Sequence, residues 1–268
     1  MKKIIGIVIV YLVLVLPAKG QSVRQVQDML SHYSQRIQTL RVSNDYENRD
    51  DSLKAINKSL VNYLKTVGEK NPATLTAKFK SKEWVNILTS ADGLFRIYSW
   101  DVCKDGTAKS YDAVFQYRSN KKVVTFVMGD ASVDEDSEGV VCSGEYYYKL
   151  YTIHTKDSGN VYLVLGYSSY ASGYGGNSLT AYKLRNGEFI GAYPFFKTAK
   201  TTVGEINFQY DLEAPINENK KAEMPDIRLS KDKQTIYIPV ITRHDEITKR
   251  DLIYKFDGNR FVYDKNAK

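Results

Sequence analysis

Apolar residues in the segment 21–70 recur at the spacing of an α-helix. Two series step by three or four positions: Val23, Val26, Leu30, Tyr33, Ile37 and Leu40, and then Leu53, Ile56, Leu60, Leu64 and Val67. Each series places one apolar stripe along a helix. A polar segment, Ser43 to Asp51, separates the two, and we expect Gly68 to end the second helix. The pattern predicts a helical hairpin, whose stripes must be buried on the rest of this chain or on another protein.

From Trp84 onward the pattern changes to that of β-strands. Short alternating or β-branched and aromatic runs are bounded by Gly, Asp, Asn and Ser, as strands usually are. The predicted strands cover 95–100, 113–118, 122–128, 146–155, 161–167, 179–184, 188–193, 205–212, 227–230, 234–241, 251–256 and 260–263. Because no apolar pattern of helix length separates them, antiparallel meanders are favoured. Pro239 is expected at an edge or a bulge, since it cannot donate to a strand ladder.

These patterns predict an α+β fold with mostly antiparallel β structure. Residues 71–92 are expected to be a connector between the helical hairpin and an antiparallel β domain at 93–268. Segments 182–190 and 254–262 are similar to each other, with a turn dipeptide between Tyr-Lys and a Phe that precedes a β-branched residue. This similarity favours a propeller-like meander, with a sandwich as the alternative. Any two β-hairpins can also look alike, so the similarity by itself does not establish a repeat.

The first 20 residues have the pattern of a secretory signal peptide. Lys2 and Lys3 precede a mostly aliphatic run from Ile4 to Leu16, and small residues, Ala18 and Gly20, follow Pro17. A membrane span needs about 20 apolar residues, so this run is too short to anchor the chain. We expect a periplasmic or extracellular protein without a membrane span after cleavage; an uncleaved anchor is the alternative.

Net charge limits the classes of partner. The chain carries a formal charge of +7, and removing residues 1–20 removes three lysines and no acid, which leaves +4. No cluster of Lys and Arg is longer than two residues. Such a weak excess does not indicate nucleic-acid binding.

The chain has two cysteines, Cys103 and Cys142. In an oxidising compartment, an even pair predicts a disulfide. Two separately buried thiols are the alternative, because one pair gives no spacing pattern to test.

Two segments carry a resemblance to known proteins. The segment Asp92 to Asp101, with the sequence DGLFRIYSWD, is similar to a segment of uncharacterised exported proteins of Bacteroidota-type bacteria. The run Tyr162 to Tyr167, followed by a Gly/Ser-rich segment, is similar as well. The resemblance implies export and a related β fold; that family brings no activity with it.

An acidic segment is the best candidate metal site. Asp134, Asp136, Glu138 and Glu145 fall at positions 1, 3, 5 and 12 of a calcium-loop pattern, with Gly139 at position 6. The flanking segments are predicted strands rather than helices, and Glu is longer than the usual residue at position 5. A solvated acidic hairpin loop is the alternative, so calcium is a possible cofactor and no other is indicated.

Tyrosine is the most over-represented residue, with 21 copies against 10 Phe and 2 Trp. Tyr146, Tyr147 and Tyr148 are consecutive, Tyr167 lies on a predicted strand, and Tyr170 and Tyr174 lie in a Gly/Ser-rich segment, 168–178, expected to be a flexible loop. A tyrosine ring packs while its hydroxyl stays hydrated, which suits ligand platforms and protein interfaces. Tyrosine is also simply a good strand residue. We take Tyr167, Tyr170 and Tyr174 as candidate ligand-binding residues.

The sequence contains no motif that identifies an enzyme. It has no His-Glu-x-x-His, no Gly-x-Ser-x-Gly and no glycine-rich phosphate loop, so no catalytic residue is assigned. We expect an exported, non-catalytic binding protein that engages a glycan or a protein through its tyrosine-rich surface and loop 168–178. One alternative is a hydrolase whose acidic residues sequence cannot place. A third hypothesis makes the helical hairpin an oligomerisation element.

Overall fold

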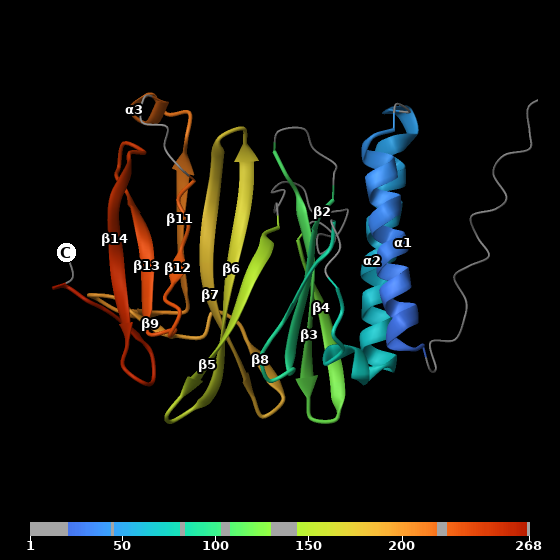
Figure 1. Cartoon of the computed structure of the whole chain (residues 1–268), viewed down its shortest axis with the longest axis horizontal. Coiled ribbons are helices and arrows are strands. Elements are labelled where there is room, and N and C mark those ends of the chain that lie inside the picture. Colours follow the sequence, from blue (N-terminus) through green and yellow to red (C-terminus); the bar gives the residue numbers. More distant parts are fainter. Residues whose placement is uncertain are drawn as a thin grey trace, which may run out of the picture.

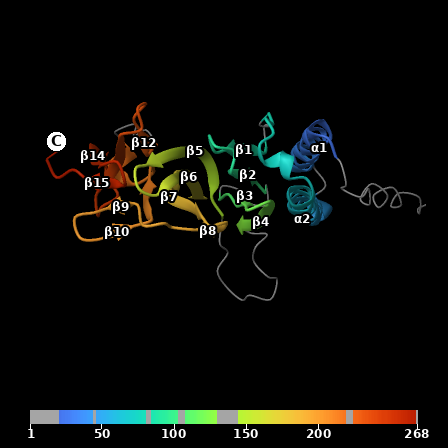
Figure 2. The same ribbon diagram turned by 90° about the horizontal axis from the view of Figure 1, so that it is seen from below.

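The computed structural model describes residues 21–43, 46–80, 84–102, 108–129, 144–218 and 224–266. Its elements form four layers in a row: a pair of helices and three β-sheets, here called sheets A, B and C (Figures 1 and 2). The helices precede the β domain in sequence, and all strand pairs among the described residues are antiparallel except one. The predicted α+β class is confirmed.

The helical hairpin forms as the apolar periodicity predicted. Helix α1 covers Val23–Arg41 and begins with a capping box between Ser22 and Gln25, and α2 covers Tyr46–Lys70. The apolar stripes, apart from the exposed Val23, are buried in one cluster shared by the two helices and one face of sheet A. The stripe that could have served oligomerisation is therefore already covered by this chain.

Sheet A begins inside the segment expected to be a connector. A short 3₁₀ helix, η1, covers Pro72–Leu75, and the first strand starts at residue 86. The sheet has the order β1-β2-β3-β4. Its strands are β1 Asn86–Thr89, β2 Phe95–Asp101, β3 Tyr111–Ser119 and β4 Lys122–Gly129. The β3–β4 turn is tight, with Asn120 at a φ of 53°.

Sheet B is the middle layer, and it is not a simple meander. Its order is β11-β7-β6-β5, with β8 paired to the far end of β7. Its strands are β5 Tyr146–Thr155, β6 Gly159–Ala171, β7 Tyr174–Arg185, β8 Glu188–Ile190 and β11 Glu205–Asp211. Strand β11 returns to the free edge of β7 after two strands of sheet C.

Sheet C forms the outermost layer, in the order β10-β9-β15-β14-β13-β12. Its strands are β9 Phe196–Lys197, β10 Thr202–Val203, β12 Arg228–Leu229, β13 Thr235–Ile241, β14 Ile247–Phe256 and β15 Phe261–Tyr263. The β9–β15 pair is parallel, which departs from the predicted meander. The pairing of β13 with β14 is irregular between Pro239 and Ile241, as the bulge prediction for Pro239 required. A four-residue helix, α3, covers Pro215–Glu218 at the upper end of Figure 1.

Three apolar clusters hold the layers together. One lies between the helices and sheet A around Trp100, the second between sheets A and B around Phe115, and the third between sheets B and C around Leu165. Both faces of sheets A and B are therefore packed over at least part of their area. Neither refinement of the fold, the propeller nor the sandwich, is confirmed; the similar segments 182–190 and 254–262 are two hairpins, in sheets B and C.

Candidate functional site

The segment predicted to be a flexible loop is mostly a β-hairpin. Strand β6 runs to Ala171 and β7 begins at Tyr174, so only Ser172 and Gly173 form the turn. The loop prediction for 168–178 is wrong, because residues that are common in loops also adopt extended conformations when neighbouring strands pair with them. Here β7 is paired on both sides, with β6 and β11, and this ladder holds the small residues extended.

The hairpin displays two of the three candidate tyrosines as a pair. The ring centroids of Tyr170 and Tyr174 lie 5.2 Å apart, with the rings inclined at 47°. The two side chains are 37% and 38% exposed, so they are open to a partner. The ring of Tyr170 lies over Gly176, where a Cβ atom would come within 3.3 Å of its hydroxyl. The hydroxyl of Tyr174 donates a hydrogen bond of 2.8 Å to Gln209 on β11.

Polar side chains of β11 extend the same face. Strand pairing sets Gln209 opposite Gly176, Asn207 opposite Ser178 and Glu205 opposite Thr180. Paired residues point to the same side of a sheet. Glu205, Asn207 and Gln209 are exposed, whereas the alternate residues of β11, including Phe208, pack toward sheet C. We call the set Tyr170, Tyr174, Ser178, Glu205, Asn207 and Gln209 the β7–β11 face.

This face lies beyond the part of sheet B that sheet A covers. Sheet A packs on β5, at the opposite edge of sheet B from β11. On β7, Tyr182 and Leu184 are the residues that join the cluster between sheets A and B. The upper half of β7, from Tyr174 to Thr180, extends past that cluster toward the β6–β7 turn.

Glu145 lies at the inner border of the β7–β11 face. Its Oε2 accepts a hydrogen bond of 2.9 Å from Ser178, and the carboxyl group covers Gly166 so closely that a Cβ there would be 2.5 Å from Oε2. Burial raises the pKa of Glu145, and the nearby Glu205 carboxylate adds to the rise, against the opposing effect of the hydroxyls of Ser178 and Tyr147. Two carboxyl groups with different environments therefore share this face.

The third candidate, Tyr167, belongs to a different group. Strand alternation turns it to the side of sheet B that faces sheet C, next to its strand partner Tyr146. It lies 6.3 Å from the ring of Tyr111 and is hydrogen-bonded to Tyr210. Burial, followed by the charge of Tyr167, raises the pKa of Tyr210. The structure thus brings Tyr170 and Tyr174 together but places Tyr167 in a separate, more buried tyrosine cluster.

The consecutive tyrosines divide between two environments. Tyr147 is buried between sheets A and B. Tyr148 donates a 2.6 Å hydrogen bond to Asp226, whose other oxygen lies 3.5 Å from the Nζ atom of Lys149. Tyr148 and Lys149 thus link β5 to Asp226, shortly before β12, and Tyr147 packs in the core between sheets A and B.

Several sequence-predicted residues fall outside the described ranges. These are Asp134, Asp136 and Glu138 of the calcium pattern, both members of the predicted disulfide (Cys103 and Cys142), and the predicted signal peptide, 1–20. Of the four metal candidates, the structure describes Glu145. Within the ranges the structure describes, no group of three or more His, Cys, Asp or Glu side chains is placed to hold a metal ion. Among those same residues, no helix has the length and apolar character needed to cross a membrane.

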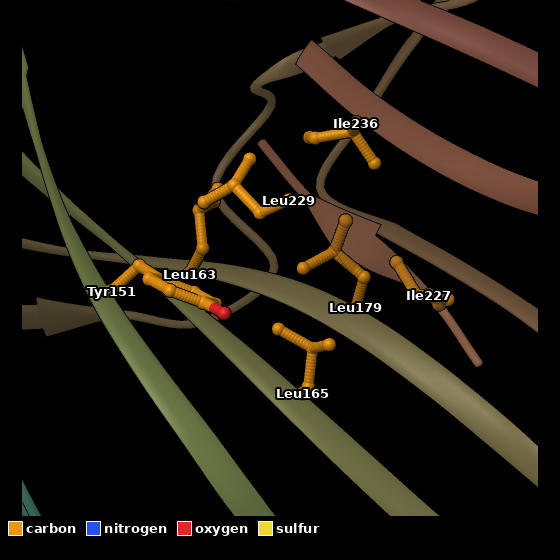
Figure 3. A pocket seen from close by; sticks show the side chains of 7 residues that line it. All are labelled: Tyr151, Leu163, Leu165, Leu179, Ile227, Leu229 and Ile236. Atoms are coloured by element: carbon orange, nitrogen blue, oxygen red, sulfur yellow. The ribbon is translucent and has the colours of Figure 1, made fainter. Parts of the chain in front are cut away.

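An apolar gap between sheets B and C is not a ligand site. The gap measures about 170 Å³, part of which is open to solvent, and it has no room for a water molecule (Figure 3). Its lining is aliphatic apart from one ring: Tyr151, Leu163, Leu165, Leu179, Ile227, Leu229 and Ile236. The gap is an imperfection in core packing, since ligand pockets combine apolar walls with placed polar groups and enough volume for the ligand.

Sequence reasoning missed the β11 side of the site. The alternation of Glu205, Asn207 and Gln209 with Ile206 and Phe208 was visible, and it indicates a strand with one exposed polar face. What the sequence could not show is that β11 pairs with β7 beside the tyrosines. Comparisons of the chain with protein-family models, with curated proteins and with solved structures find no match.

Proposed function

We propose that this chain is an exported binding protein that takes up a glycan on its β7–β11 face. The observation that carries the proposal is the exposed pair Tyr170 and Tyr174 at the end of a strand face that also displays amides and carboxylates. Aromatic rings stack against the apolar faces of sugar rings, while amide and carboxylate groups bond to their hydroxyls. Export rests on the signal-peptide pattern of residues 1–20 and on the resemblance of Asp92–Asp101 to exported proteins.

A glycan fits this face better than a folded protein partner. The polar side chains stand along one strand, so an extended chain of sugars can follow β11 away from the tyrosines. Gln209 already fixes the hydroxyl of Tyr174 at 2.8 Å, which limits the freedom that this ring would lose on binding. A protein interface usually requires a larger apolar centre than two half-exposed rings.

The test is to replace both rings and measure glycan binding. We expect Tyr170→Ala and Tyr174→Ala each to weaken binding about tenfold, which corresponds to about 1.4 kcal/mol. Tyr174→Phe keeps the ring and loses the bond to Gln209, so it should retain most of the affinity. Tyr237→Ala, on the far face of sheet C, is the control and should bind as the wild type does. The measurement is calorimetric titration with oligosaccharides chosen from a glycan array.

Thermal unfolding of the same variants separates binding from folding. Because both rings are more than one-third exposed, we expect a loss of stability below about 1 kcal/mol. If Tyr170→Ala and Tyr174→Ala instead unfold much earlier, the rings belong to the core and the proposal fails.

A hydrolase is the second candidate, favoured by the carboxyl groups of Glu145 and Glu205 on one face. A buried carboxyl with a raised pKa, together with a second carboxyl in a more exposed setting, is the kind of pair that glycoside hydrolysis uses for its acid and its base or nucleophile. Shortening of the oligosaccharide during the binding measurement would support this candidate.

A further inference from the structure

The β7–β11 face has a charge opposite to that of the chain as a whole. The 24 residues from Gly159 to Tyr182 contain no charged side chain, and residues 205–218 contain acids and no Lys or Arg. The chain overall is basic, with 38 Lys and Arg against 31 acids. The two strands and the turn that form this face therefore carry acids but no Lys or Arg between Gly159 and Tyr182 or between 205 and 218.

Three carboxylates lie along β11 and the turn after it. Asp211 stands opposite Tyr174, and Glu213 accepts a 3.0 Å hydrogen bond from Ser172 in the β6–β7 turn, so both lie at the tyrosine end. Glu205 is exposed at the other end of β11, opposite Thr180, six residues along β7 from Tyr174. The ion pairs formed between described residues leave all three without a Lys or Arg nitrogen within 4 Å. Carboxylates that no described cation neutralises attract a positively charged ligand.

The tyrosine rings also favour a positively charged ligand. A cation over the face of a tyrosine ring is attracted by the ring quadrupole, as it is by a carboxylate. Elsewhere in this protein, cations use the same contact: Lys183 lies 4.6 Å from the ring centre of Tyr193, and Arg228 lies 5.4 Å from that of Tyr237. Within the described residues, no such cation is assigned to Tyr170 or Tyr174.

We infer that the ligand of the β7–β11 face is a glycan that carries free, protonated amines rather than a neutral one. This inference rests on the proposed function, since it specifies the chemistry of the same ligand. The sugar rings stack on Tyr170 and Tyr174, and the ammonium groups lie near Glu205 and Glu213. A neutral sugar would bring no counter-charge to those carboxylates.

The experiment compares two oligosaccharides of equal length on the purified protein. The probes are the tetramer of N-acetylglucosamine, which is neutral, and its fully de-acetylated counterpart, which is cationic at pH 6. We expect the cationic tetramer to bind about tenfold more tightly at low salt, and about as weakly as the neutral one at 0.5 M salt, because salt screens exposed charges.

Charge-neutral variants test which residues are responsible. Glu205→Gln and Glu213→Gln together should reduce the preference for the cationic tetramer over the neutral one to about twofold. Glu188→Gln on β8, an exposed glutamate away from the face, is the matched control and should keep the full preference.

The outcomes distinguish the two proposals. If both tetramers bind with equal affinity and Tyr170→Ala abolishes that binding, the inference of a cationic ligand is rejected. The proposed glycan-binding function would still be supported. Binding of a short lysine peptide without binding of either tetramer would overturn both, because the face would then recognise charge on a peptide. A preference that survives Glu205→Gln and Glu213→Gln together would also reject the inference, since other groups would then cause it.

Discussion

At the scale of single residues, two glycines lie where another side chain touches the backbone. A Cβ atom on Gly68 of α2 would lie 2.4 Å from Nε2 of Gln116 and 2.7 Å from Oγ1 of Thr125. A Cβ on Gly166 of β6 would meet the carboxyl group of Glu145. The prediction that Gly68 ends α2 was wrong, because the helix continues to Lys70. Gly68 has no side chain at the point where α2 approaches sheet A, so the helix can pack closely against Gln116 and Thr125.

Gly68→Ala is expected to destabilise the protein. Alanine favours a helix over glycine by about 1 kcal/mol, but a forced contact with a buried side chain costs about 1–3 kcal/mol. Gln116 is fully buried and already donates to the carbonyl of Leu64 at 2.9 Å, so it has little room to move. The measurement is the free energy of unfolding in urea.

Gly191→Ala is the control for this substitution. The nearest atom to a Cβ at that position lies 3.9 Å away, an ordinary contact. A Gly68→Ala protein at least as stable as the wild type would show that the helix–sheet contact yields without cost.

At the scale of elements, a buried arginine fixes the connector to the second strand of sheet A. Arg96 on β2 is 1% exposed, and its guanidinium donates to the carbonyls of Thr74 and Ala77. Its Nε donates to Thr89 on β1 at 2.9 Å, and the ring of Phe79 lies 4.8 Å from its central carbon. The arginine of the FRIYSWD segment thus holds η1 and the following residues against the sheet.

Arg96→Met is expected to lower the free energy of unfolding by about 2–4 kcal/mol. Methionine fills a similar length, but it leaves two carbonyls without their donor, and each unpaired buried group costs about 1–3 kcal/mol. Arg96→Lys should recover only part of the loss, since an ammonium cannot reproduce the planar fork of donors. Denaturant titration is the measurement, and the same change at the exposed Arg185 should have little effect. A stable Arg96→Met protein would mean that the connector does not need this anchor.

At the scale of the whole molecule, polar contacts at the ends of the sheets fix one layer to the next. In the β1–β2 turn, Asp92 accepts hydrogen bonds from Asn160 at 2.7 Å and Tyr162 at 2.8 Å, both on β6, so it joins sheet A to sheet B. The β5–β6 and β14–β15 turns meet through Asp157 and Asn259, which join sheet B to sheet C. The apolar clusters supply most of the burial, and these polar contacts fix the register between layers.

The hydrogen bonds of Asp92 make the free energy of unfolding depend on pH in the acidic range. Burial raises the pKa of Asp92, but the hydrogen bonds from Ser90, Leu94, Asn160 and Tyr162 outweigh it and hold the pKa below its ordinary value. As pH falls, the unfolded chain therefore takes up this proton first. The stabilisation from Asp92 is complete above about pH 5 and disappears as pH falls through the lowered value of the folded protein.

Asp92→Asn should destabilise the protein by about 1–3 kcal/mol at pH 7, because one acceptor oxygen is replaced by a donor. The difference from the wild type should narrow as pH is lowered toward about 2.5. Urea titrations at both pH values test this, with the exposed Asp28→Asn as control. A difference that stays constant with pH would contradict an ionised Asp92 as the link between sheets A and B.

Local pattern alone was sufficient for much of the secondary structure. The two helices were predictable because one burial stripe per helix leaves a period of three to four residues in the sequence, and most strands were predictable from alternation and β-branched content. The bulge at Pro239 was predictable for a covalent reason, the missing N–H. The segment 168–178 was not, because glycine and serine are extended there only through pairing with β6 and β11.

What the sequence by itself determined are the properties that depend on neighbours along the chain: the helical hairpin and most of the antiparallel strands. Tertiary structure decided which residues meet across the chain. It returned β11 to the edge of β7, some 30 positions later, and so placed Gln209, Asn207 and Glu205 beside the tyrosines. It also separated Tyr167 from them, because successive residues of a strand face opposite sides and sheet B is packed on both. Pairing between distant strands depends on the burial of whole layers, which no local pattern records.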